Sequence, residues 1–145
     1  NPARPETSSL YLGDKTQLTL GDILRENLRF DRFELVTFSA CNTAVAASSS
    51  STEGRAIESL GATAQIQGAR AVLATLWQVS DTSTSQLMQA FYQERAKTPS
   101  ISKAQALREA QLAMLEGRLR PANKKDNAWS APYHWAPFVL MGNWR

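Results

Sequence analysis

Two apolar runs constrain the fold of this chain more than any other feature of its sequence. Residues 35–40 and 71–77 are nearly continuous in apolar side chains, a pattern typical of strands buried on both faces of a parallel sheet. A third run covers residues 136–141, and Pro137 near its start favours an edge strand, because proline lacks the N–H that a central strand needs. Helical patterns separate the three runs. Strands that alternate with helices predict a parallel sheet covered by helices.

The helices that we expect between these runs are marked by capping residues. Thr19 with Asp22 forms a capping-box pattern, and Asp81 leads a cluster of good N-cap residues. Gly68 ends a predicted helix at residues 53–67 as a C′ glycine. The apolar side chains expected to face the core share a helical spacing: Leu20, Ile23, Leu24, Leu28, Ile57, Leu60, Ala64, Ile66, Leu87, Met88, Phe91, Tyr92, Leu107, Ala110, Met114 and Leu115.

The composition excludes several classes of protein. The chain has 145 residues, of which 43% are hydrophobic and 20% charged, as in one globular domain. It contains no apolar run of membrane-spanning length, so we expect no membrane partner. No glycine-rich loop follows a strand, which argues against a nucleotide-binding domain, and we expect no cofactor.

The cysteine, the histidine and the basic residues bear on the compartment, on metal binding and on nucleic-acid binding. A single cysteine permits no internal disulfide and fits a reducing, cytoplasmic compartment. With one cysteine and one histidine, a zinc site has too few ligands, and we expect no metal. Four basic residues gather in one stretch without interleaved aromatic residues: Arg118, Arg120, Lys124 and Lys125. We therefore expect this stretch to be a solvated connector, with no nucleic-acid partner.

Cys41 is the candidate nucleophile, because it directly follows the first apolar run. Open α/β folds carry their chemistry at the carboxyl edge of the sheet. A cysteine nucleophile needs a base, and the single histidine is His134. We place His134 at the entry to the last strand, far along the chain from Cys41 and in an unpromising place for its base. Without this context a lone cysteine is more often a small core residue.

Six blocks of the sequence occur in an order and spacing that match a known family. They cover residues 39–43, 53–54, 68–70 with 76–81, 87–92, 106–111 and 135–142. Together they resemble the CHAT domain, a caspase-like cysteine peptidase related to separase and often found behind tetratricopeptide repeats. The resemblance implies a caspase-like three-layer α/β sandwich with a mostly parallel sheet and helices on both faces. Residues 1–145 would be the C-terminal part of one such domain, with about three main strands and four helices.

The resemblance also implies roles for individual residues. Cys41 matches the nucleophile, its backbone N–H would donate to the oxyanion, and the catalytic histidine would lie upstream of the chain. Residues 76–81 resemble a separase pattern, which implies that Asp81 lies in an S1 pocket for Arg or Lys. Asp81 would also serve as a helix N-cap, which alone explains an Asp there. Ser39 and Trp77 would be walls of the pocket.

The predicted function is that of a cysteine endopeptidase domain that cleaves polypeptides after Arg or Lys. Because the base is expected in the N-terminal half of the domain, the isolated chain is expected to be inactive. Further expected partners are tetratricopeptide repeats and, through the edge of the strand at 35–40, a second copy of the chain. The alternative is a pseudo-peptidase, a regulatory or protein-interaction module of a larger repeat protein in which Cys41 is only structural.

Overall fold

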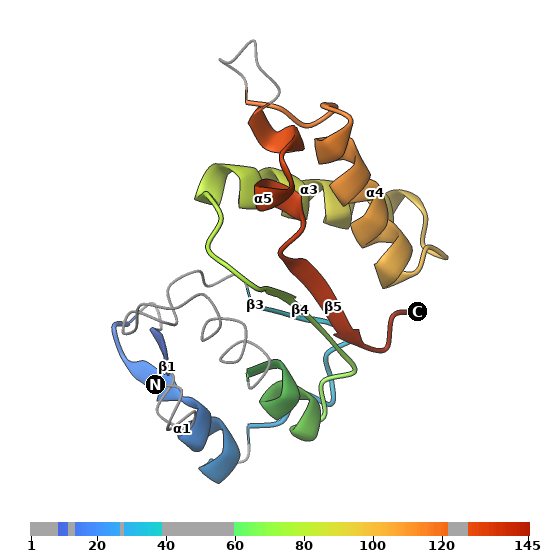
Figure 1. Ribbon diagram of the computed structural model, residues 1–145. Helices are drawn as coiled ribbons and strands as arrows, with labels where there is room; N and C mark the ends of the chain where they lie inside the picture. Colours follow the sequence, from blue (N-terminus) through green and yellow to red (C-terminus); the bar gives the residue numbers. More distant parts are fainter. Residues whose placement is uncertain (1–8, 12–13, 27, 39–59, 122–127) are drawn as a thin grey trace. The chain divides into compact units, whose positions relative to one another are not determined.

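Strands and helices are interspersed along the chain in the computed structural model, which describes residues 9–11, 14–26, 28–38, 60–121 and 128–145 (Figure 1). The chain divides into two units. The first comprises Asn1–Gln78 with Met141–Asn143, and the second comprises Val79–Leu140 with Trp144–Arg145. No helix in these described ranges is long and apolar enough to cross a membrane.

The first unit begins with a β-hairpin that leads into a short helix. β1, Ser9–Tyr11, pairs antiparallel with β2, Gln17–Thr19, and α1 follows at once as Leu20–Arg25. The predicted capping box is confirmed. Thr19 Oγ1 accepts the Asp22 N–H at 3.0 Å, and Asp22 Oδ2 accepts the Thr19 N–H at 2.9 Å. The sequence does not reveal β2, because three residues are too few to show the alternation of apolar and polar side chains that marks a strand.

A three-stranded sheet has the order β3-β4-β5. β3, Val36–Phe38, runs parallel to β4, Ala71–Thr75, with Phe38 opposite Ala74. β5, Phe138–Gly142, flanks β4 on the other side and spans the boundary between the units. The mixed α/β fold with a parallel pair and a last strand at the edge of the described sheet is therefore confirmed. Every residue of β4 is buried as expected, whereas the described part of β3 is only half-buried.

Two apolar clusters around β4 and the helical residues 60–66 form the core of the first unit. Their buried members are Ala64, Ala69, Val72 and Ala74 in one cluster and Leu20, Ile23 and Leu60 in the other. Phe30 and Phe38 pack against both clusters and so join them. Gly68 follows the helix with φ +98°, which confirms the predicted C′ glycine, since L-residues avoid this left-handed region.

Two long helices pack against each other in the second unit. They are α3, Asp81–Lys97, and α4, Lys103–Leu115. Their buried apolar side chains are Leu87, Phe91, Ala106, Leu107, Ala110, Ala113 and Met114. Ser102 and Gln105 form a capping box at the start of α4, and Gly117 follows its end with φ +73°.

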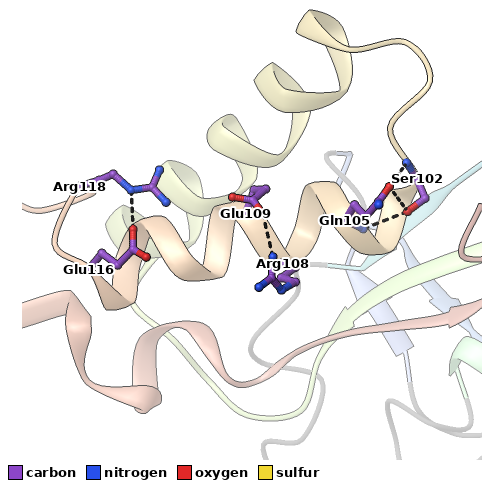
Figure 2. A network of polar contacts seen from close by, with 6 residues as sticks. All are labelled: Ser102, Gln105, Arg108, Glu109, Glu116 and Arg118. Atoms are coloured by element: carbon purple, nitrogen blue, oxygen red, sulfur yellow. Dashed lines mark hydrogen bonds and ion pairs between the residues drawn. The ribbon is translucent and has the colours of Figure 1, made fainter.

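Charged pairs lie on the exposed side of α4 and just after its end (Figure 2). Arg108 Nη1 lies 3.0 Å from Glu109 Oε1, and Arg118 Nε lies 2.8 Å from Glu116 Oε2. Exposed pairs of this kind stabilise a fold by about 0–1 kcal/mol each. The Glu116 carboxylate offsets the charge of Arg118, one of the four clustered basic residues, whereas Lys124 and Lys125 lie outside the described residues.

Short helical turns precede β5. They are η2, Ala128–Ser130, and α5, Pro132–Trp135. Pro132 occupies the first position of α5, where its missing N–H costs no hydrogen bond. His134 therefore lies on a helical turn that leads into β5, a turn that the sequence did not reveal. Four residues are too few for helical periodicity to be recognised in the sequence.

Four apolar side chains expected in the core are exposed instead. Their exposed fractions are 46% for Leu24, 75% for Ile66, 48% for Tyr92 and 46% for Leu115. Three of them directly follow a buried residue: Ile23, Phe91 and Met114. One step along an α-helix turns the side chain by about 100°, so the second residue of each pair leaves the buried face.

The residues after β5 bond to the start of α4. The Ala104 N–H donates to the Trp144 carbonyl at 3.2 Å, and Lys103 Nζ donates to the Arg145 carbonyl. Lys103 is 2% exposed. Because a buried ammonium is costly without partners, the carbonyl of Arg145 helps to satisfy it.

Candidate active site

The predicted site residues fall on different parts of the chain. Cys41 and Ser39 lie outside the described residues, so their roles stay predictions. Trp77 follows β4 in the first unit and is half-buried, whereas Asp81 is the first residue of α3 in the second unit. Within the described ranges, no group of three or more His, Cys, Asp or Glu side chains could hold a metal ion.

β3 and β4 end at the same edge of the sheet because they are parallel. Phe38, the last residue of β3, lies opposite Ala74, one residue before the end of β4. In the sequence, Cys41 comes three residues after Phe38, and Trp77 comes two residues after Thr75. The carboxyl ends of parallel strands are the positions at which open α/β folds present their reactive groups.

Asp81 begins α3 but does not cap it. The N-cap is Ser80, which has an extended backbone and whose Oγ accepts the Ser83 N–H at 3.3 Å. The interpretation of Asp81 as an N-cap is therefore wrong. Its carboxylate lies in the first turn, where the helix dipole favours negative charge. The side chain is exposed, and no hydrogen bond or ion pair engages it within the described part of the chain.

A hydrogen-bonded cluster lies in the same turn as Asp81. Ser83 is 0% exposed, and its Oγ lies 3.0 Å from the Ser80 carbonyl oxygen and 2.9 Å from Ser80 Oγ. His134 Nδ1 of α5 lies 3.2 Å from the same Ser83 Oγ. Tyr133 packs edge-on against the His134 ring, with centroids 5.3 Å apart. Serines three apart at a helix start are a visible capping signal, but their histidine partner, 51 residues from Ser83, is not.

Comparison with known proteins identifies a family. The family model of the CHAT domain matches residues 1–143. This range contains all of the predicted site residues and the cluster around Ser83. No curated protein and no solved structure matches the chain.

Proposed function

Because the chain belongs to the CHAT domain family, we propose that it carries the nucleophile of a cysteine endopeptidase that cleaves polypeptides after Arg or Lys. The family is related to caspase-like peptidases. The observation that carries the proposal is the parallel pairing of β3 with β4, because Cys41 follows in sequence the edge at which both strands end. Reactive groups of α/β enzymes are found at such edges.

The proposed reaction proceeds through an acyl-enzyme. A base removes the proton from Cys41 Sγ, and the thiolate attacks the carbonyl carbon of the scissile peptide bond. The Cys41 N–H donates to the oxyanion, the base returns the proton to the leaving amine, and water then hydrolyses the thioester. The single histidine of the chain contacts Ser83. We therefore assign the base to a histidine in the upstream part of the same domain.

Asp81 is the proposed selector of the basic residue at P1. Its carboxylate is exposed at the start of α3, and no described residue pairs with it. A carboxylate binds a guanidinium through two parallel N–H···O bonds, which favours Arg over neutral side chains. Trp77 and Ser39 are the further residues proposed to contact the substrate.

The proposed setting is a cytoplasmic protein with tetratricopeptide repeats. A single cysteine in the chain suits a reducing compartment, where a catalytic thiol stays free. β3 is the end strand of the described sheet, so strands of the upstream half would extend the sheet on that side.

Turnover by the intact protein tests this proposal. We expect cleavage of peptides with Arg or Lys at P1 and none by Cys41→Ala. Asp81→Asn should lower kcat/KM for these peptides by about tenfold to a hundredfold, because the cationic side chain loses its charged partner. Glu94→Gln removes another acid of α3, one that pairs with Lys97, and serves as the control with unchanged activity.

Thiol reactivity separates the proposal from its alternative. Alkylation of Cys41 in the intact protein should be fast and should titrate below the ordinary thiol pKa of about 8.5. Slow alkylation with an ordinary pH profile, together with no turnover, would contradict the peptidase and favour the pseudo-peptidase module.

A further inference from the structure

The proton positions in the cluster follow from the contacts of one hydroxyl. Ser83 Oγ has a single proton, and its lone pairs accept. The Ser80 carbonyl, 3.0 Å away, can only accept, so it receives the Ser83 proton. Ser80 Oγ at 2.9 Å and His134 Nδ1 at 3.2 Å must then both donate. All three contacts are hydrogen bonds only when the imidazole carries its proton on Nδ1.

The segment that bears His134 is held by its own hydrogen bonds. Trp135 Nε1 donates to the Ser130 carbonyl at 3.0 Å. Gln111 Nε2 of α4 donates to the carbonyls of Trp135 and Phe138, at 3.0 and 3.2 Å. α5 is thereby tied to α4, and the half-buried ring of His134 presents its Nδ1 from a fixed backbone.

Ser83 connects this ring to the first turn of α3. Its N–H donates to Ser80 Oγ at 3.3 Å, and the Thr84 N–H donates to the Ser80 carbonyl at 3.0 Å. Asp81 lies between Ser80 and Ser83 in the chain. Its backbone therefore moves only if this hydrogen-bonded turn moves.

From these contacts we propose that His134 is a positioning residue for recognition of the P1 side chain. Its Nδ1–H bond to Ser83 holds the first turn of α3 and so sets the direction of the Asp81 carboxylate. The proposal rests on the substrate role proposed for Asp81 above. His134 transfers no proton in the reaction.

NMR of the ring nitrogens tests the hydrogen bond independently of activity. With ¹⁵N-labelled histidine, at a pH where the ring is neutral, Nδ1 should show the shift of a protonated nitrogen and Nε2 that of an unprotonated one. His134→Asn identifies these signals by their loss. Ser83→Ala should return the ring to the Nε2–H tautomer, which free histidine prefers. A proton on Nε2 in the unaltered protein would overturn the proposal.

Substrate selectivity tests the positioning role. His134→Leu removes the donor and should lower the ratio of kcat/KM for Arg over citrulline at P1 by about tenfold, the effect of one hydrogen bond. The change should lie mainly in KM. His134→Asn keeps an N–H near the position of Nδ1 and should restore most of the ratio. Thr82→Ala, an exposed change in the same turn, is the control with an unchanged ratio.

The two proposals fail in different ways. If His134→Leu folds, as judged by its thermal transition, and keeps full Arg selectivity while Asp81→Asn loses it, the positioning role is wrong and the peptidase stands. If the intact protein has no turnover, the peptidase is wrong and P1 recognition by His134 falls with it. The NMR measurement of the His134 tautomer then still shows whether the hydrogen bond from His134 to Ser83 exists.

Discussion

At the scale of single residues, two consecutive buried hydroxyls near the start of α3 differ in their hydrogen bonding. Ser83 is 0% exposed and its Oγ has three polar contacts. Thr84 is 8% exposed, and its Oγ1 has no hydrogen-bond partner among the described residues. A buried hydroxyl without a partner costs about 1–3 kcal/mol. Neighbouring positions of one helix therefore offer a matched pair for mutation.

Thr84→Val should raise the free energy of unfolding by about 1 kcal/mol, because it removes the unpaired hydroxyl and keeps the branched shape. Ser83→Ala should lower it by about 1–3 kcal/mol, because the contacts to Ser80 and His134 are lost. Urea unfolding of the two variants measures both changes. A Thr84→Val protein less stable than the unaltered one would show that the hydroxyl is satisfied.

At the scale of elements, α1 depends on a charged capping box. Hydrogen bonds from the Thr19 side chain and backbone, followed by one from Arg25, lower the pKa of Asp22 from 3.8 to about 2. Because the ionised carboxylate accepts these bonds more strongly than the neutral acid does, the folded state binds the proton more weakly than the unfolded state. The box thus stabilises α1 fully above pH 3.8 and loses this effect as the pH falls towards 2.

Acid titration checks this linkage. The free energy of unfolding should fall between pH 3.8 and about 2, and Asp22→Asn should remove the part of the fall due to this residue. Arg25→Gln should keep most of the fall due to Asp22, since the hydrogen bonds from Thr19 lower its pKa more than Arg25 does. Equal acid profiles for the unaltered protein and Asp22→Asn would refute the assignment.

At the scale of the whole molecule, the described sheet ends at β3. The residues of β3 are half-buried, whereas those of β4 are fully buried. A strand with apolar side chains at the end of a sheet is prone to pair with another chain. We therefore propose that the isolated chain uses this side to associate with a second copy, a side that the upstream half of the domain would otherwise occupy.

The isolated chain should accordingly form a dimer at high concentration and show no peptidase turnover. Light scattering measures the mass, and a clean monomer would contradict the sheet extension. Leu115→Lys alters an exposed apolar residue of the second unit. The dimer should survive this control, because strand pairing does not use that surface.

Local signals in the sequence were sufficient for much of the fold. The Thr19–Asp22 capping box, the left-handed Gly68 and the buried strand β4 are all confirmed. Each depends on neighbours within a few residues or on an unbroken apolar run. Asp81 shows the limit of predicting an N-cap from residue types, because Ser80, one residue earlier, is the N-cap of α3. Both residue types cap helices well, and only the backbone angles distinguish them.

The sequence by itself determined the family, the parallel α/β arrangement and the candidate residues Cys41 and Asp81. Only the tertiary structure decided where the buried face of each helix ends and that His134 bonds to Ser83. The physical reason is the range of the interactions. Caps and strand runs are specified between near neighbours, whereas a hydrogen bond between residues 51 positions apart forms only when α5 and α3 pack together.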